Sequence, residues 1–135
     1  MNERTLDHVG IAVTSLDTSI PLWEALLGAT ASGRERVESQ GVEIVFVGSG
    51  TGRVELLCPI RPNSPVAQFL ERKGPGIHHL GYRVPDLPAA IDAARSEGFA
   101  LVDEEPREGA HGRRIAFLHP RALNGVLVEL VEVPD

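Results

Sequence analysis

The sequence contains one cysteine, Cys58, and this excludes an intramolecular disulfide. No apolar run approaches the roughly 20 residues that a membrane-spanning helix needs. Basic residues number 13 against 19 acidic ones, and a net charge of -6 disfavours binding to a phosphate backbone. The N-terminal segment MNERTLDHVG has no basic region followed by an apolar one, which a secretory signal would require. We therefore expect a cytoplasmic protein without nucleic-acid or membrane partners.

The length of 135 residues and the apolar content of 42% are typical of one globular domain. A domain of this size buries roughly two thirds of the surface that its unfolded chain exposes. Neither a disulfide nor a structural metal is therefore needed merely to fold the chain.

An internal repeat organises the sequence. The segment Leu6–Val13 resembles Ile77–Val84 at an offset of 71, and the same offset relates Phe46 to Phe117. Val54–Leu56 matches Val128–Leu130 at an offset of 74, which places about three additional residues in a loop of the second copy. The sequence therefore indicates two tandem copies of one module.

Each module has the pattern strand, helix and several strands. In the first, a β-rich run over residues 7–13 precedes apolar residues at helical spacing that end before Gly28. Ser15 or Asp17 is expected to accept from N–H groups at the start of this helix, while Pro21 within the pattern predicts a start near Ser19 or a kink. The glycine-rich stretch 48–52 separates two β-rich runs, and it predicts a turn because no helix opens after it, as a phosphate loop would require.

The second module repeats the scheme, so each is predicted to be a βαβββ unit within a single domain over residues 1–135. Ser64 is expected to cap a short helix in the connection between the modules. The predicted bounds are about 5–59 for module one, 60–73 for the connection and 75–133 for module two, with second-module elements at 76–84, 87–97, near Leu101, 115–118 and 125–133.

The repeat places His8 and His79 at equivalent points of the two first strands, and Glu55 and Glu129 at equivalent points of the two last strands. Equivalent side chains of two modules packed with pseudo-twofold symmetry converge on the symmetry axis. Two imidazoles and two carboxylates suit a divalent transition metal and leave two open positions on an octahedral ion. Taken singly, such strand residues are usually solvated, but the duplicated set favours a metal because buried charges need partners.

Several ordered segments carry a resemblance to a known family. LDHVGIAV, GIHHLGYRV and GVLVELVE resemble the vicinal oxygen chelate superfamily, and QGVEIVFV, SPVAQFL and EEPREGAHGRRIAFLHP resemble its methylmalonyl-CoA epimerase family. The resemblance implies an α+β fold in which two tandem βαβββ modules form a cupped mixed sheet with helices outside. It also implies one divalent metal ion, Co²⁺ before Mn²⁺, Ni²⁺ or Zn²⁺, held at His8, Glu55, His79 and Glu129.

The activity that this resemblance implies is interconversion of the (R) and (S) forms of methylmalonyl-CoA. A metal that grips the thioester and carboxylate oxygens would stabilise the enolate left after removal of the C2 proton. Some family members carry a catalytic glutamate where this chain has Ile44, while Glu43 stands one place earlier and would face the other way in a regular strand. Three sources of protons remain open: Glu129, Glu43 brought round by a bulge, and a metal-bound water. We favour Glu129 for one face of the substrate and leave the other face open.

Further residues are candidates for substrate binding. The loop 109–113 has two glycines that can turn backbone N–H groups toward an anion, although it is equally compatible with a simple turn. Gln40 and His119 are candidates by resemblance, and arginines are plausible partners of the CoA phosphates. The substrate-binding candidates are Gln40, Ala110, His111, Gly112, Arg113 and His119, and the phosphate candidates are Arg113, Arg114 and Arg121.

Three other functions use a similar fold or site. A glyoxalase I-like lyase would act on glutathione hemithioacetals, and a drug-sequestering binding protein would need no metal. An iron dioxygenase would prefer two histidines and one carboxylate, so the second glutamate counts against it. Sheet edges and apolar helix faces favour a homodimer. The ligand that the resemblance implies is a CoA thioester.

Overall fold

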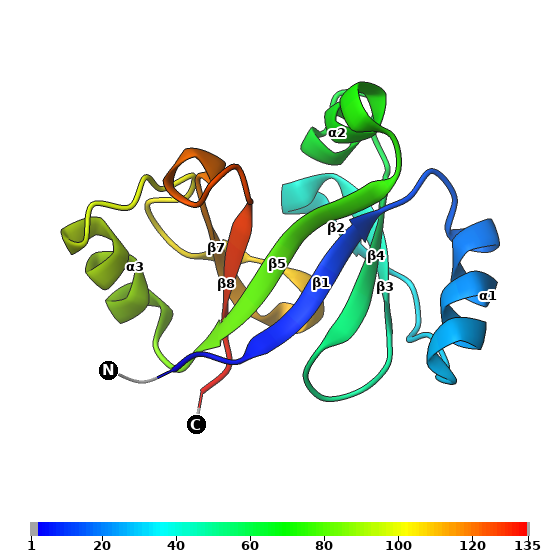
Figure 1. Cartoon of the computed structure of the whole chain (residues 1–135), viewed down its shortest axis with the longest axis horizontal. Helices are drawn as coiled ribbons and strands as arrows, with labels where there is room; N and C mark the ends of the chain where they lie inside the picture. Colours follow the sequence, from blue (N-terminus) through cyan, green and yellow to red (C-terminus); the bar gives the residue numbers. More distant parts are fainter. Residues whose placement is uncertain (1–2, 135) are drawn as a thin grey trace. The chain divides into compact units, whose positions relative to one another are not determined.

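The structure, a computed structural model, describes residues 3–134 and divides into two compact units. One unit consists of His8–His78, and the other combines His79–Asp135 with the N-terminal residues up to Asp7. Within residues 3–134 the chain forms eight β-strands and three α-helices (Figure 1). None of the helices in this range is long and apolar enough to span a membrane.

The first unit contains the elements of the first module and the connection that follows, except that Leu6 and Asp7 at the start of β1 belong to the other unit. These elements are β1 (Leu6–Ala12), α1 (Leu16–Leu27), β2 (Glu35–Val37), β3 (Val42–Val47), β4 (Arg53–Pro59) and α2 (Pro65–Lys73). The strand order is β2-β3-β4-β1, with β1 parallel to β4 and the other neighbours antiparallel. A parallel neighbour for β1 arises because α1 carries the chain across before β2 begins.

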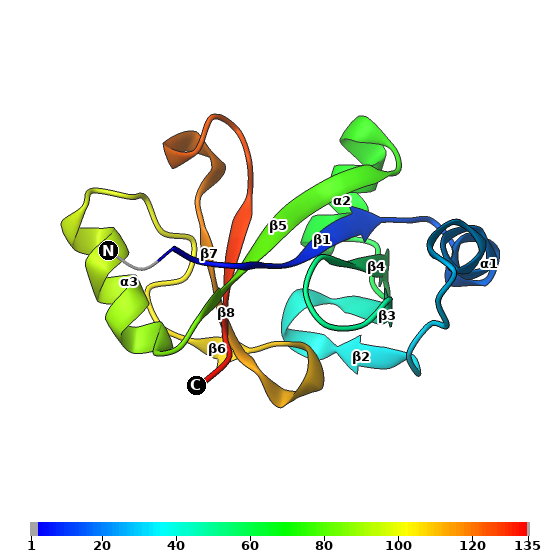
Figure 2. The same cartoon turned by 60° about the horizontal axis from the view of Figure 1, so that its bottom comes forward.

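The second unit repeats this order of elements. They are β5 (Gly76–Val84), α3 (Leu87–Ser96), β6 (Arg107–Glu108), β7 (Arg114–Leu118) and β8 (Val128–Glu132). The strand order is β5-β8-β7-β6, with β5 parallel to β8, and β6, β7 and β8 lie side by side in Figure 2. The predicted βαβββ pattern is therefore confirmed in both modules.

Helix α1 begins earlier than Pro21 predicts. The Ser15 side chain accepts a hydrogen bond from Thr18 N–H, so the helix is capped at Ser15 and starts at Leu16. The expected late start near Ser19 was therefore wrong. Pro21 removes one backbone donor inside the helix, but the capped first turn already forms the Ser19 N–H to Ser15 O bond. The helix ends as expected at Gly28, which adopts a left-handed conformation.

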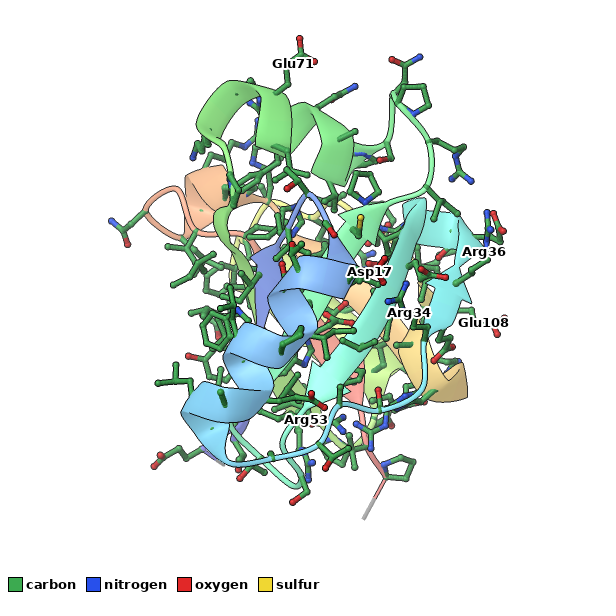
Figure 3. The ribbon with its side chains drawn as sticks, turned by 90° about the vertical axis from the view of Figure 1, so that its right-hand side faces the viewer. Asp17, Arg34, Arg36, Arg53, Glu71 and Glu108 are labelled. Atoms are coloured by element: carbon green, nitrogen blue, oxygen red, sulfur yellow. The ribbon has the colours of Figure 1, made fainter. Side chains whose placement is uncertain are left out.

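Contacts outside the core hold α1 to the connection that follows it. Arg34 donates to the Asp17 carboxylate, and both side chains are labelled in Figure 3. The Glu24 carboxylate accepts a hydrogen bond of 2.7 Å from Ala31 N–H, closing the turn after the helix. These contacts hold both ends of α1 to the segment between α1 and β2.

Each unit packs a helix against one face of its strands. In the first unit, Leu16 of α1 contacts a cluster that includes Val45 and Leu56. In the second, Leu87 and Ile91 of α3 contact a cluster that includes Leu130. Because neighbouring residues of a strand point to opposite faces, the side chains between these core residues lie on the other face, which carries the histidines and glutamates of the repeat.

The second module departs from the predicted strand positions at one place. Leu101 forms only an isolated bridge with Leu118, and the outer strand β6 lies instead at Arg107–Glu108. The segment between them contains Glu104, Glu105 and Pro106, and acidic residues and proline disfavour strand pairing. The strand predicted near Leu101 is therefore displaced toward the next β-compatible residues.

Glu132 joins α3 to β7 and β8. Its carboxylate accepts from Arg114 Nε at 2.9 Å and Nη2 at 3.0 Å, and from the backbone N–H of Leu87 at 2.8 Å. The Arg114 hydrogen bond and then the Leu87 hydrogen bond lower the pKa of Glu132 below its ordinary value. Because the pKa in the folded state is the lower one, this stabilisation is present above the unfolded-state pKa and is lost as the pH falls through the folded-state pKa.

We therefore predict that Glu132→Gln lowers the free energy of unfolding at pH 7 and that this loss shrinks on acidification. The measurement is urea denaturation of wild type and variant from pH 7 to below the ordinary pKa of glutamate. Asp92→Asn serves as the control, because Asp92 pairs with Arg95 at an exposed position of α3. A loss that stays constant over the whole pH range would contradict the assignment.

Candidate metal centre

The first unit pairs a buried histidine with a buried glutamate. His8 on β1 and Glu55 on β4 are 2% and 6% exposed, and His8 Nε2 lies 3.4 Å from Glu55 Oε1. In the parallel β1–β4 register, Gly10 stands beside Glu55. Because Gly10 has no side chain, it leaves room for the Glu55 carboxylate beside β1.

The second unit repeats this arrangement. His79 on β5 and Glu129 on β8 are 1% and 4% exposed, and their Nε2 and Oε1 atoms are 3.8 Å apart. Gly81 stands beside Glu129 in the β5–β8 register. The equivalence that the repeat predicts for the two His–Glu pairs therefore extends to the glycine neighbour of each glutamate.

The donor set fits a divalent cation. A buried carboxylate is costly unless it is paired, hydrogen-bonded or bound to a metal, and each unit buries one beside an imidazole. The first unit offers such ligand types at His8 and Glu55, and the second offers them at His79 and Glu129. Imidazole with carboxylate is the ligand combination typical of transition metals rather than of calcium or magnesium.

Two phenylalanines, which the sequence reasoning did not single out, border these pairs. Phe46 packs edge to face with His8 at a centroid distance of 5.7 Å, and Phe117 does so with His79 at 5.6 Å. The repeat offset that relates the two phenylalanines was visible in the sequence. It could have identified them, because the offset that relates the two histidines also relates the two phenylalanines.

The structure places Glu43 and Ile44, which are neighbours on β3, on opposite faces of the strand. Ile44 pairs with Leu57 and lies, fully buried, on the face of Glu55. Glu43 pairs with Cys58 on the other face, and its carboxylate is 3.6 Å from Arg34. The β3–β4 register is continuous from Val42 to Val47, so the bulge that would bring Glu43 round is absent. The role of Glu43 as a base stays a prediction that its position does not favour.

Cys58 lies beside Glu43 on this helix-facing side. Its thiol contacts the carbonyl oxygen of Thr14 at 3.6 Å, and burial raises the pKa of the thiol. A raised pKa keeps the side chain in the unreactive thiol form. Cys58 is half-buried and packs against the apolar cluster of the first unit.

The loop predicted to hold an anion contains a sharp turn. Gly109 N–H donates to the Arg113 carbonyl at 2.8 Å, and His111 and Gly112 have positive φ values of 58° and 67°. A Cβ added at Gly109 would lie 2.9 Å from Ile115 Cγ2, so only glycine fits there. The turn is thus packed against Ile115 of β7, which lies two residues before Phe117, and Ala110 and His111 lie between the two glycines.

The other predicted substrate residues have varied surroundings. Arg113 Nη1 lies 3.5 Å from the buried Asp7 carboxylate, and Arg114 is bound to Glu132. His119 Nδ1 accepts from Arg121 N–H at 3.1 Å and so caps a short 3-10 turn, while Arg121 is exposed. Gln40 is half-buried at the end of the 3-10 turn Glu38–Gln40, before β3. Their roles toward substrate stay predictions.

Comparison with known proteins identifies the family. Residues 7–117 match the family model described as the glyoxalase/bleomycin resistance protein/dioxygenase superfamily. The chain is 42% identical to the uncharacterized protein YqjC of Bacillus subtilis, over 94% of this chain and 91% of that protein. It is 41% identical to the mitochondrial methylmalonyl-CoA epimerase of Dictyostelium discoideum, over 94% of this chain and 77% of that protein. The chain belongs to the methylmalonyl-CoA epimerase family of this superfamily.

A solved structure supports the same assignment. A methylmalonyl-CoA epimerase in complex with methylmalonyl-CoA and NH4+ superimposes with a TM-score of 0.92 at 34% identity, covering 97% of this chain and 95% of that one. The vicinal oxygen chelate fold expected for the epimerase family is thereby confirmed.

Asp7 is a buried charged residue that joins several elements of the fold. It precedes His8, is 1% exposed, and its Oδ1 accepts from Arg83 Nε at 2.8 Å and lies 3.5 Å from Arg113 Nη1. The backbone N–H of Arg83 also donates to Thr5 O at 2.9 Å. Asp7 thus ties the start of β1, β5 and the turn before β7 together within one unit.

We predict that Asp7→Asn destabilises the protein, because two arginines lose the negative charge that faces them. The expected loss is about 2 kcal/mol, below that for a fully buried pair because both arginine side chains are about a third exposed. Urea denaturation measures it, with Glu104→Gln, an exposed partner of Arg95, as the control. Equal stability of Asp7→Asn and wild type would contradict the prediction.

Proposed function

We propose that this protein is a metal-dependent epimerase that interconverts the (R) and (S) forms of methylmalonyl-CoA. The observation that carries the proposal is the buried His–Glu pair, present once in each unit of a chain that belongs to the epimerase family. The substrate follows from the similar protein that is described in complex with methylmalonyl-CoA.

The proposed ligands of one divalent cation are His8, Glu55, His79 and Glu129, with Co²⁺ as the expected ion. A bound ion would supply electrostatic stabilisation of the negative charge that develops on the thioester oxygen. The burial of all four side chains supports this set, because a charge at such depth needs compensation.

Proton transfer is assigned to Glu129 for one face of the substrate. Glu129 is buried beside Ile115, Phe117 and Val131, which pack together on the same face of β7 and β8. From this face the carboxylate is proposed to take the C2 proton, while a second group that exchanges its proton with solvent delivers one to the opposite face. The group for the opposite face is left open.

Substrate binding is assigned to the residues around the turn before β7. Backbone N–H groups of Ala110, His111 and Gly112 are proposed to bind the substrate carboxylate, aided by the left-handed turn at the last two. Gln40, Arg113 and His119 complete the proposed substrate-binding set. We further propose a cytoplasmic location and a homodimer. The exposed Leu22 and Leu26 on one side of α1 support the homodimer.

We predict deuterium exchange at C2 that depends on metal. Cobalt-loaded protein is incubated in D2O with one epimer of methylmalonyl-CoA, against a metal-stripped sample, and deuterium content and chirality are followed. Metal-dependent deuteration with loss of chirality is expected. If protein shown to contain cobalt exchanges no more deuterium at C2 than the metal-stripped sample, the epimerase proposal is wrong. The same samples are then assayed with a glutathione hemithioacetal, because its conversion would favour a glyoxalase.

A pair of glutamine variants tests the assignment of Glu129. Glutamine keeps an oxygen donor for the metal but cannot take up a proton, so Glu129→Gln should retain cobalt and lose C2 exchange by about 100-fold or more. The matched control is Glu55→Gln at the equivalent position, where the proposed role is ligation alone and a smaller loss is expected. Equal losses in the two variants, with cobalt retained in both, would contradict the assignment.

A further inference from the structure

In the first unit, Phe46 contacts the histidine of the pair and lies in register with the glutamate. Phe46 and Glu55 are cross-strand partners on β3 and β4, so their side chains share one face. The Phe46 and His8 rings meet at an interplanar angle of 86°. The Arg53 guanidinium lies over the Phe46 ring, 4.0 Å from its centre.

The second unit has the same contacts. Phe117 and Glu129 are cross-strand partners on β7 and β8, and the Phe117 and His79 rings meet at 90°. The Arg107 guanidinium lies over Phe117, 5.4 Å from the ring centre. Each proposed half-site therefore contains a histidine, a glutamate, a phenylalanine in contact with the histidine, and an arginine over that phenylalanine.

The two arginines do not correspond in the repeat. Arg53 lies on β4, two residues before Glu55, whereas Arg107 lies on β6, next to Ile115 of β7. Duplication of a module accounts for the two phenylalanines but not for a cation on each of their rings. The same contact is thus made from two different strands, as expected if the position of each ring matters for the site.

We propose that Phe46 and Phe117 are positioning residues, each of which fixes the imidazole plane of its histidine so that Nε2 faces the paired glutamate. This deepens the proposed function, since it rests on the metal site described above. An imidazole rotates about its Cβ–Cγ bond, and a perpendicular ring contact restricts this rotation. Ligands ordered before the ion arrives lose less conformational entropy on binding, so the affinity for the ion is higher.

A similar trio elsewhere provides the control. Phe69 of α2 contacts His78 at 5.1 Å and 80°, and the Lys73 ammonium lies 5.7 Å from the Phe69 ring centre. His78 is not among the proposed ligands. Phe69→Leu therefore removes the same kind of aromatic contact without touching the site.

The experiment measures Co²⁺ affinity of Phe46→Leu, Phe117→Leu, the double variant and Phe69→Leu, together with the unfolding temperature of each metal-free protein. We expect each site variant to bind Co²⁺ about tenfold more weakly, and the double variant about 100-fold more weakly if the effects add as free energies. Phe69→Leu should bind like wild type. In metal-free protein, ¹⁵N signals of the His8 or His79 ring should broaden or shift only when the phenylalanine in contact with it is replaced.

Unchanged Co²⁺ affinity and ring signals in folded site variants, with unfolding temperatures lowered as in Phe69→Leu, would overturn the proposal and leave the rings as core filling. If a leucine variant does not fold, methionine at the same position replaces it, because it keeps an apolar side chain of similar volume. None of these readouts uses methylmalonyl-CoA. Weakened Co²⁺ binding in a protein without epimerase activity would therefore uphold this inference while rejecting the proposed reaction.

Discussion

The burial of a carboxylate next to an imidazole, once in each unit, is the constraint from which the other features of the structure follow. Glu55 and Glu129 are both more than nine tenths buried, and a negative charge at that depth requires compensation. Each is placed by a strand with a glycine on one neighbouring strand and a phenylalanine on the other. The strand register thus gives each carboxylate space beside the glycine and an aromatic ring beside the phenylalanine.

Strand alternation separates packing from chemistry in both units. On one face of the strands, residues such as Leu56 and Leu130 pack against the helices. The other face carries the His–Glu pairs and the apolar side chains around them. A single residue shift in register would exchange the two faces, placing the glutamates under a helix. Ile44 and Glu43 illustrate the point, because adjacent residues of β3 have entirely different environments.

Much of the fold and of the candidate site was predictable because the chain contains its own comparison. The offset between the modules identified the equivalent histidines and glutamates. Local errors came from elements whose outcome depends on competing terms. The start of α1 was decided by the Ser15 cap against Pro21, and the outer strand of the second module by the acidic and proline-containing segment after Leu101.

The sequence by itself determined the repeat, the βαβββ pattern and the four proposed ligands, because periodicity and equivalence are properties of residue order. The family was indicated by the resemblance of whole segments. Tertiary structure alone decided which side chains surround the proposed ligands. The partners of Asp7 lie 76 and 106 residues away, and the arginines over Phe46 and Phe117 come from strands that do not correspond in the repeat. Such contacts depend on strand register and side-chain direction, which are fixed only when the chain packs and its backbone hydrogen bonds form.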